Sequence, residues 1–477
     1  MALKSKEIRV RMAPSPTGLL HFGNARTALF NYLFTKHSGG KLILRIEDTD
    51  IERSDKAFEK DIIDNLKWLG IIWDEGPFLQ SERTSIYIKY LDKLVKDGLA
   101  YYCFCTQEEL EGKKQEQMSR GVPAKYNGKC HNLSEEEIKK YLSQGKPSVI
   151  RFKIPEKKVS FNDIIRGKIE FESSLLGDFV IAKDLSTPLY NFALVVDDFE
   201  MKISHVIRGE DHIPNTPKQI LLQEALNLPQ PKYGHLPLIL GPDKSKLSKR
   251  HGTQSIAEYR KQGYLAESVI NFMAFLGWNP GTEKEIFSMD SLIKEFSLEK
   301  VQKSGAIFNI QRLDYLNGFY IRQKSIDELT ELCQPYLPAS PAGGPKIDKQ
   351  KLQQIIAMHK ERLKKLSEIK ELTDFFFKQP QYSKELLRWK KADDEQIKQS
   401  LDILEKLLFK IKRWDKAEIE NVLMVEAEQT GDRGILLWPF RVALSGKKAS
   451  AGPFEIAEAL GKEETLIRIK QAKELIL

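Results

Sequence analysis

Short apolar stretches alternate with amphipathic ones over the first 100 residues of the chain. Residues 8–13 and 42–46 are apolar runs of strand length, and residues 24–36 carry apolar side chains at helical spacing. Glycine and proline interrupt the pattern at residues 14–18 and 38–40. The order strand, helix, strand predicts a βαβ unit, the building block of a parallel sheet.

The pattern changes twice further along the chain. Residues 101–189 contain three of the four cysteines, a charged helical stretch and strand patterns near residues 149–154 and 159–171. Outside this stretch we expect helices at 55–69, 84–96 and 216–226, an apolar segment at 191–196, and strands at 206–207 and 236–240. From about residue 255 strand patterns fade, and we expect helices at 256–278, 326–336, 351–373, 394–412, 417–428 and 453–460. The pattern predicts an α/β fold with an insertion, followed by an all-α region.

Composition narrows the class of protein. The chain has 477 residues, 41% of them hydrophobic and 30% charged, which is typical of a soluble globular protein of roughly three domains. No run of 18 apolar residues and no apolar N-terminal segment occurs, so we expect no membrane span and no secretory signal. Four cysteines are too few to stabilise a chain of this length by disulfide bonds, and we expect a cytoplasmic protein with reduced thiols. The net charge of +8 permits a polyanionic partner without requiring one.

Two loops carry candidate chemistry. Residues 14–24, PSPTGLLHFGN, lie between the first strand and the first helix, where the helix N-terminus favours a phosphate. His21 can donate a hydrogen bond there, and Gly23 lets a ligand approach the backbone. Residues 244–252, KSKLSKRHG, form a basic loop that could close over a triphosphate. Each loop alone is also typical of a structural turn or a solvated surface.

Together, and in this order, the two loops resemble the signature motifs of class I aminoacyl-tRNA synthetases. His21–Asn24 matches His-Ile-Gly-His, and Lys246–Arg250 matches Lys-Met-Ser-Lys-Ser, with Asn24 and Arg250 as departures. Four further segments resemble the glutamyl/glutaminyl branch: residues 11–18, 45–50, 195–198 and 206–211. The all-α C-terminal region resembles that of bacterial-type glutamyl-tRNA synthetases, because the other members of the branch end in β-barrels.

The resemblance implies a fold class and a domain order. The fold is α/β: a Rossmann-type parallel-sheet catalytic domain with an α+β insertion, followed by an all-α anticodon-binding region. The expected parts are residues 1–100 and 190–254 as the two halves of the catalytic domain, 101–189 as an inserted acceptor-binding subdomain, 255–320 as a helical stem-contact domain, and 321–375 and 376–477 as two helical parts of the anticodon-binding domain.

The resemblance also implies a glutamate site. Glutamate carries two carboxylates and one ammonium, so a selective site needs arginines and an acid. The expected contacts are Arg11, Ala13, Ser15, Glu47, Tyr190 and Arg208. We expect Arg11 and Tyr190 at the side-chain carboxylate, Glu47 at the ammonium and Arg208 at the α-carboxylate.

ATP is expected between the two signature loops. The implied ATP contacts are His21, Gly23, Asn24, Asp211, Leu238, Ile239 and Lys249, and the implied catalytic residues are His21, Gly23, Lys246 and Lys249. The reaction implied is formation of glutamyl-adenylate, with Mg²⁺ on the phosphates, and then transfer to the 3′ end of tRNA(Glu). In this family activation of glutamate usually requires bound tRNA.

Three cysteines within 28 residues suggest a structural Zn²⁺. By resemblance to related enzymes, the expected ligands are Cys103, Cys105, Tyr126 and Cys130, with His131 as the alternative to Tyr126. A zinc-free subdomain is the other possibility.

The basic segment 351–370 is expected to be a helical face that contacts the anticodon, with Arg362 testing its third base. Three functions remain open: a glutamate–tRNA ligase acting as a monomer, a version that also charges tRNA(Gln), and a non-catalytic tRNA-binding paralogue. The presence of His21, Gly23, Glu47, Arg208 and Lys249 argues against the paralogue.

Overall fold

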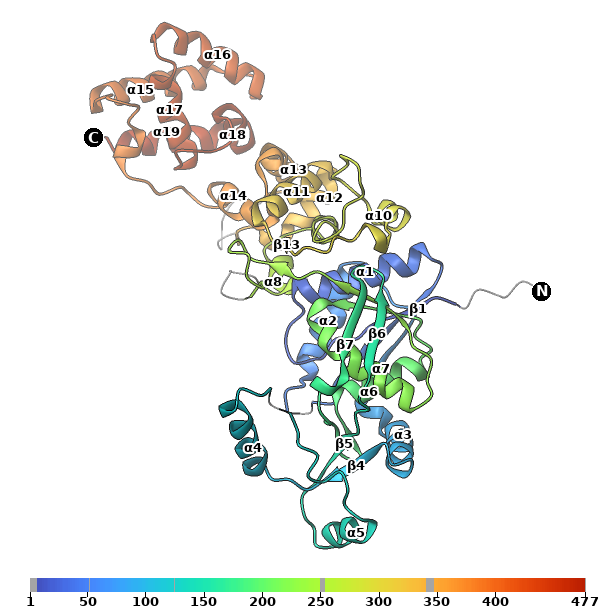
Figure 1. Cartoon of the computed structure of the whole chain (residues 1–477). Helices are drawn as coiled ribbons and strands as arrows, with labels where there is room; N and C mark the ends of the chain where they lie inside the picture. The colour runs from blue at the N-terminus through green and yellow to red at the C-terminus, as the bar shows by residue number, and fades with distance from the viewer. Residues whose placement is uncertain (1–6, 51, 124, 249–253, 340–346, 477) are drawn as a thin grey trace, which may run out of the picture. The chain divides into compact units, whose positions relative to one another are not determined.

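The structure is a computed structural model of the whole chain and describes residues 7–50, 52–123, 125–248, 254–339 and 347–476 (Figure 1). The chain divides into two compact units. Unit 1 comprises Met1–Arg260 and Ala266–Arg312, and unit 2 comprises Lys261–Leu265 and Leu313–Leu477. The chain therefore passes between the units three times, and the finer division into six parts stays a prediction.

Unit 1 is built on parallel strands covered by helices, as the sequence predicts. Strands β1, β2 and β3 pair in parallel, and so do β10 and β11. The elements outside the insertion are β1 (Arg9–Met12), α1 (Phe22–His37), β2 (Lys41–Ile46), α2 (Lys56–Trp68), β3 (Glu75–Leu79), η1 (Gln80–Arg83), α3 (Thr84–Lys96), α6 (Tyr190–Glu200), β10 (His205–Gly209), η3 (Glu210–Asn215), α7 (Thr216–Ala225), β11 (Lys232–Leu236), β12 (Ile239–Leu240), α8 (Ile256–Lys261), α9 (Ala266–Ala274), α10 (Met289–Glu295), η5 (Leu298–Lys300) and β13 (Ala306–Ile307).

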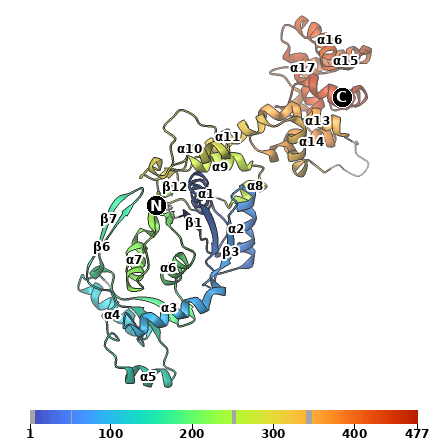
Figure 2. The ribbon, with the colours of Figure 1, turned by 90° about the vertical axis from the view of Figure 1, so that its right-hand side faces the viewer.

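Helix α1 lies at the centre of this unit. It packs against β1, β2 and β10 on one side and against α9 and α10 on the other, so residues all around it are buried (Figure 2). His21 caps its N-terminus through the side chain, and Ser38 and Gly39 end it, with Gly39 in the left-handed conformation at φ +65°. The first signature loop is thereby fixed at the start of a rigid helix.

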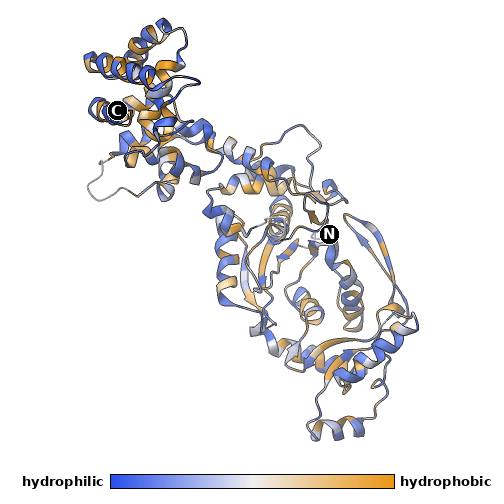
Figure 3. Cartoon of the chain, turned by 90° about the vertical axis from the view of Figure 1, so that its left-hand side faces the viewer, coloured by the Kyte–Doolittle hydropathy of each residue, from blue (hydrophilic) through white to orange (hydrophobic). Residues whose placement is uncertain are grey.

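The insertion is α+β, as expected. Its elements are β4 (Ala100–Cys103), α4 (Gln107–Ser119), α5 (Glu135–Ser143), β5 (Val149–Phe152), β6 (Lys158–Asp163), β7 (Gly167–Glu172), η2 (Ser173–Leu175), β8 (Phe179–Asp184) and β9 (Thr187–Pro188). Strands β4, β5, β8 and β9 form an antiparallel sheet, whereas the β6–β7 hairpin joins the sheet of β10 and β11. Helices α4 and α5 begin with capping boxes and bury no residue, and Figure 3 shows them largely hydrophilic.

The structure gives one expected segment of unit 1 its element type and divides another. The apolar segment 191–196 lies in helix α6 and is buried on every side, because α3 and α7 pack against it. The strand expected at 236–240 is split into β11 and β12, because Pro237 has no N–H to donate to a ladder and its carbonyl accepts from Arg26.

Unit 2 is helical in its described part. Its elements are α11 (Ile310–Gln323, which begins in unit 1), α12 (Ile326–Cys333), η6 (Gln334–Tyr336), α13 (Lys349–His359), η7 (Lys360–Arg362), η8 (Leu366–Glu368), α14 (Ile369–Phe377), η9 (Lys384–Leu387), α15 (Asp394–Lys410), α16 (Lys416–Gln429), α17 (Gly434–Ser445), α18 (Pro453–Leu460) and α19 (Lys462–Glu474). No helix in the described ranges is both long and apolar enough to span a bilayer.

The helix expected at 351–373 is wrong as a single element. Helix α13 ends at His359, and the chain resumes as a helix only at Ile369. Between them the backbone bonds laterally: Lys364 O accepts from Asn317, and Leu366 N–H donates to Gly263 O. The basic residues of this segment therefore do not share one helical face.

Candidate active site

Four of the residues expected to contact glutamate meet at the carboxyl edge of the parallel strands of unit 1. Arg11 lies in β1, Glu47 directly follows β2, Arg208 lies in β10, and Tyr190 begins α6. Burial raises the pKa of Tyr190 to about 12, with Arg208 and Arg11 acting to lower it and Glu47 to raise it. The four groups are thus within electrostatic reach of one another. Ala13 and Ser15 follow β1, the former half-buried and the latter exposed.

A buried ionic network lies beneath this group. Arg45 donates to Glu47 at 2.9 Å and to Asp198 at 2.8 Å, and Asp198 also accepts from Arg11 Nε at 3.1 Å. Burial raises the pKa of Glu47, while the guanidinium groups of Arg45 and Arg11 oppose that rise. A substrate ammonium beside Glu47 would further favour the ionised carboxylate.

Arg208 is held on one side only. Its Nε donates to His235 Nε2 at 3.2 Å, and its Nη2 donates to Thr216 Oγ1 and Gln219 Oε1, each at 2.8 Å. Its Nη1 is buried without a hydrogen-bond partner among the described residues. An unpaired buried donor is costly, so this nitrogen is suited to a carboxylate ligand.

The first signature loop presents His21 at the N-terminus of α1. His21 Nδ1 accepts from Gly23 N–H at 3.2 Å, which leaves the proton on Nε2, free to point at a phosphate. Desolvation and the charge of Lys246 lower the pKa of His21, and Asp211 opposes this. Lys246 pairs with Asp211 at 3.0 Å, and because both act electrostatically on His21, the described part of the basic loop lies near the first loop.

The remaining expected ATP contacts differ in burial and in the hydrogen bonds that they already make within the protein. Asn24 is half-buried in the first turn of α1. Leu238 N–H donates to Glu210 at 2.7 Å, and Leu238 O accepts from Ala306, so this backbone is already bonded within the protein. Ile239 O accepts from Leu247. Lys249 lies outside the described residues.

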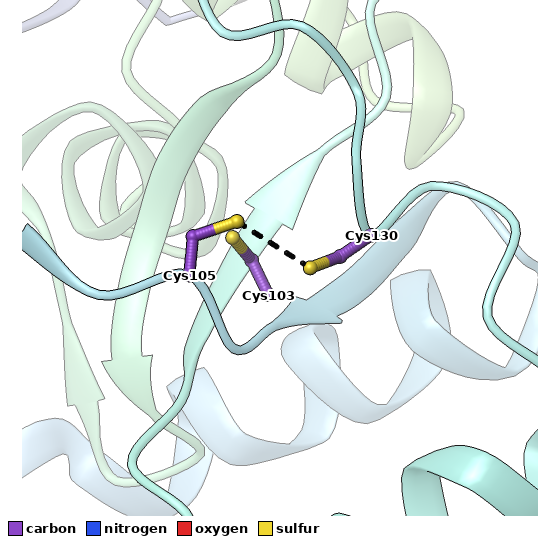
Figure 4. Close-up of side chains that lie close together, drawn as sticks. All are labelled: Cys103, Cys105 and Cys130. Carbon is purple, nitrogen blue, oxygen red and sulfur yellow. Dashed lines mark hydrogen bonds between the residues drawn. The ribbon is translucent and has the colours of Figure 1, made fainter. Parts of the chain in front are cut away.

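Three cysteines of the insertion converge (Figure 4). The sulfur atoms of Cys103, Cys105 and Cys130 lie within 4.8 Å of one another, and the Cys105 and Cys130 sulfurs are 3.6 Å apart. The hydroxyl of Tyr126 lies 3.4 Å from the sulfurs of both Cys103 and Cys105. His131 instead pairs with Asp178 at 3.3 Å.

The three sulfur atoms are spaced closely enough to serve as ligands of one metal ion. A Zn–S bond of about 2.3 Å places two tetrahedral sulfur ligands about 3.8 Å apart. The separation between Cys105 and Cys130 is close to this value, and the thiolates would form as the metal binds.

Arg362 lies in η7, not on an extended helix. Its Nη1 donates to Ser450 O at 2.5 Å, and Arg441 donates to the same carbonyl at 3.0 Å. The side chain of Arg362 is otherwise exposed. Two arginines from separate helical segments therefore converge on one loop of unit 2.

Several residues that support the site were given no role from the sequence, although Arg45 and Asp198 lie in the quoted segments 45–50 and 195–198. Arg45 and Asp198 are fully or nearly fully buried, and so are His235 and Asp163. Arg45 does carry a signal, since it is the one charge inside the apolar run 42–46. Asp163 and His235 carry none, because their pairing joins segments 72 residues apart.

Comparison with known proteins identifies the family. Residues 7–315 match the family of class I tRNA synthetases (E and Q), catalytic domain, and residues 328–473 match an anticodon binding domain. The chain is 46% identical over 476 residues to glutamate–tRNA ligase 2 of Thermoanaerobacter pseudethanolicus, with 98% of each chain covered. It is 47% identical over 484 residues to glutamate–tRNA ligase 1 of Caldicellulosiruptor saccharolyticus, with 97% of this chain and 98% of the relative covered.

A solved structure agrees with these matches. The crystal structure of a glutamate tRNA ligase from Elizabethkingia meningosepticum, in complex with its amino acid, matches with a TM-score of 0.89 at 37% identity, covering 99% of this chain and 100% of that one. Sequence, fold and the converging signature loops agree, and the chain belongs to the class I tRNA synthetases, in the family that groups the glutamate and glutamine enzymes.

Proposed function

We propose that this protein is a glutamate–tRNA ligase, an ATP-dependent aminoacyl-tRNA synthetase that forms glutamyl-adenylate and transfers glutamate to tRNA(Glu). The observation that carries the proposal is the charge pattern at the sheet edge. Two arginines, Arg11 and Arg208, and one carboxylate, Glu47, come from three parallel strands to one place. This pattern is complementary to two carboxylates and one ammonium.

Within this site the roles are assigned by charge and, for Arg208, by its unpaired nitrogen. Arg11 and Tyr190 receive the side-chain carboxylate, Glu47 receives the ammonium, and Arg208 Nη1 steers the α-carboxylate. Ala13 and Ser15 line the approach after β1. No protein nucleophile is needed, since the α-carboxylate itself attacks the α-phosphate, so the protein contributes orientation and charge stabilisation.

ATP is proposed to lie beside His21 and Gly23, with Asn24 in the same helical turn and Asp211 at the ribose. The adenine is proposed to face the backbone of Leu238 and Ile239, where Leu238 N–H already donates to Glu210. Lys246 and Lys249 act on the phosphates from the basic loop. Mg²⁺ bound to the phosphates supplies further charge neutralisation.

The test is aminoacylation of purified tRNA(Glu) with radiolabelled glutamate, together with ATP–pyrophosphate exchange with and without tRNA. We expect charging by the wild type and exchange that requires tRNA. The variant Lys249→Ala should bind tRNA normally and lose most of the exchange, because Lys249 acts on charge that develops in the transition state. Absence of charging by the wild type would overturn the proposal and favour a non-catalytic tRNA-binding protein.

A matched control is available in the same loop. Lys244 is exposed and adopts a positive φ of 61°, a conformation that asparagine tolerates. The variant Lys244→Asn therefore removes one positive charge from the loop without straining it. We expect exchange close to that of the wild type, and a loss as large as that of Lys249→Ala would contradict a specific role for Lys249.

We further propose one structural Zn²⁺ held by Cys103, Cys105, Tyr126 and Cys130, with His131 engaged by Asp178. Elemental analysis of protein purified without chelator should find one zinc per chain, and the double variant Cys103→Ser/Cys105→Ser should lose it. Cys333→Ser is the control, because Cys333 is buried in a separate core of unit 2. Wild-type protein free of zinc would support a vestigial site.

The proposal has three further parts: the protein discriminates against tRNA(Gln), it is a monomer, and it acts in the cytoplasm. Parallel charging of tRNA(Glu) and tRNA(Gln) tests the first, and analytical ultracentrifugation tests the second. Equal charging of the two tRNAs would replace the discriminating enzyme by the non-discriminating one.

A further inference from the structure

Arg208 and two buried groups behind it form a chain, and those two groups, His235 and Asp163, lie outside every quoted motif. Arg208 in β10 and His235 in β11 are paired in register on neighbouring parallel strands. Asp163, the last residue of β6, adds a third partner: its Oδ2 lies 2.6 Å from His235 Nδ1. His235 is 0% exposed and Asp163 4%, so solvent does not compete for these bonds.

The chemistry of Asp163 determines where the proton of His235 lies. An ionised carboxylate only accepts hydrogen bonds, so His235 Nδ1 carries the proton and Nε2 is a bare acceptor. That acceptor faces Arg208 Nε–H, and arginine can only donate. The opposite tautomer would place two donors against each other.

The remaining bonds of Arg208 complete the orientation. Thr216 and Gln219 hold Nη2, while the imidazole holds Nε. Of the three guanidinium nitrogens, only Nη1 is left to the ligand among the described contacts. The direction in which Nη1 points therefore depends on Thr216, on Gln219 and on the tautomer of His235.

We propose that Asp163 is a positioning residue for the amino-acid substrate: it fixes the tautomer of His235, and through it the guanidinium of Arg208 that receives the glutamate carboxylate. The inference rests on the proposed function. Because β6 lies within the insertion, the proposal also gives the insertion a role in the amino-acid site. The β6–β7 hairpin lies beside α7 (Figure 2).

Asp163→Asn is a sharp probe, because both carboxylate oxygens accept from fixed donors. Oδ1 accepts from the N–H groups of Ile165 and Arg166, and Oδ2 accepts from His235 N–H and Nδ1. If the new amide nitrogen takes the Oδ2 position, it favours the wrong tautomer of His235. We expect the KM for glutamate to rise about tenfold or more, with the KM for ATP unchanged.

A second variant separates positioning from simple structural support. Glutamine at position 235 has no tautomer, and its carbonyl can accept from Arg208 whatever residue 163 presents. We expect His235→Gln to stay within about threefold of the wild-type KM for glutamate, and the double variant Asp163→Asn/His235→Gln to be no worse than His235→Gln. An equal loss from Asp163→Asn in both backgrounds would overturn the proposal. Glu170→Gln, an exposed carboxylate of the same hairpin paired with Lys158 and Lys168, is the control and should change nothing.

The tautomer can also be measured without any kinetic assay. Selective ¹⁵N labelling of the eight histidines, with His235 assigned from the spectrum of His235→Gln, reports which ring nitrogen is protonated. We expect the Nδ1–H form at pH 7, and an Nε2–H form or a charged ring would overturn the proposal. If the wild type charges no tRNA with glutamate, the proposed function fails, while this measurement still decides the arrangement of Asp163 and His235.

Discussion

At the scale of single residues, Arg45 illustrates how unit 1 holds charge in its interior. It is fully buried and lies near three carboxylates, those of Glu47, Asp197 and Asp198. A buried cation is tolerated when acids surround it, and each acid in turn depends on the cation. Although burial acts to raise the pKa of Asp198, Arg11 and Arg45 hold it below its ordinary value.

The variant Arg45→Met should therefore destabilise unit 1 by about 3–5 kcal/mol, because it leaves buried carboxylates without their partner. Hydrogen-exchange mass spectrometry of β1 and β2 measures this locally, apart from unit 2. The control Lys139→Met removes a cation from an exposed pair with Glu135 and should change protection by less than about 0.5 kcal/mol. Equal protection in both variants would contradict a stabilising role for Arg45.

His359 of unit 2 predicts a dependence of stability on pH. Its ring is buried and neither nitrogen has a partner among the described residues. Burial, together with Arg362 and Lys447 and against Glu455, lowers its pKa to about 4. The unfolded chain takes up this proton near pH 6.5, so the folded state loses stability as the pH falls from about 6.5 to about 4.

The expected loss from His359 between pH 7 and pH 5 is about 2 kcal/mol. His359→Phe should remove this part of the pH dependence whatever its effect at pH 7. Hydrogen exchange of α13 and α18 at the two pH values, corrected for intrinsic rates, is the measurement. A pH dependence identical to that of the wild type would contradict the assignment.

The residues of the amino-acid site could be predicted only in part. Arg11, Glu47 and Arg208 lie in short motifs and Tyr190 is implied by the family resemblance alone; the structure places the four within electrostatic reach of one another. Their supports could not be predicted, because Asp163 pairs with His235 and Asp198 pairs with Arg11 across long stretches of chain. Such pairs leave no periodic trace, and only the fold brings them into contact.

At the scale of elements, the loop between α8 and α9 shows a close contact that limits sequence choice. Gly263 has a φ of +84°, and a Cβ there would lie 2.7 Å from the backbone nitrogen of Leu366. Gly263 O also accepts from Leu366 N–H and from Asn317. The close approach thus holds the interrupted segment between α13 and α14 in place.

Two glycine variants separate conformation from contact. Gly431 has a φ of +73° with open space around it. Gly431→Ala should therefore lower the free energy of unfolding by only about 1 kcal/mol, the cost of the left-handed conformation. Gly263→Ala should lower the free energy of unfolding by about 1–3 kcal/mol more than Gly431→Ala does, because backbone atoms must move. Hydrogen exchange of the unit 2 helices compares them, and equal losses would contradict the role of the contact.

Continuous elements were predictable, and interrupted ones were not. Helix α1 and strand β2 follow from the sequence because each is continuous and Gly39 and Gly40 separate them. The expected helix at 351–373 failed because lateral bonds from Asn317 and Gly263 replace its own, which no local pattern contains. The apolar segment 191–196 is a helix buried on every side, which short apolar runs do not distinguish from a strand.

At the scale of the whole molecule, charging a tRNA requires two tasks that lie in different units. The proposed chemistry lies in unit 1, while the residue proposed to test the anticodon, Arg362, lies in unit 2. The change of pattern near residue 255 predicted the all-α C-terminal half, and the fold class is confirmed, whereas the chain leaves unit 1 for the last time only after Arg312. Selectivity is therefore a property that only the full chain can show.

We predict that Arg362→Gln relaxes discrimination between tRNA(Glu) and tRNA(Gln). A guanidinium can pair with a base edge in a way that glutamine cannot reproduce, and a wrong base at such a contact changes specificity by about tenfold to a hundredfold. The ratio of kcat/KM for the two tRNAs measures it. Lys364, an exposed neighbour, is the alternative residue for this role, so Lys364→Gln is measured in parallel, and an unchanged ratio in Arg362→Gln would refute the assignment to Arg362.

The pair formed by Lys246 and Asp211 has a consequence for how the protein responds to ionic strength. Both side chains are about half exposed, and each neutralises the charge of the other. The proposed nucleotide would bind the same two side chains, Lys246 through its phosphates and Asp211 through its ribose. When the nucleotide binds, its phosphates would replace Asp211 as the counter-ion of Lys246. The lysine would therefore have a counter-ion both before and after binding. Added salt weakens both the internal pair and its replacement. Affinity for ATP should accordingly vary less with salt than in a site where the lysine stands unpaired, and Asp211→Asn should make it more sensitive.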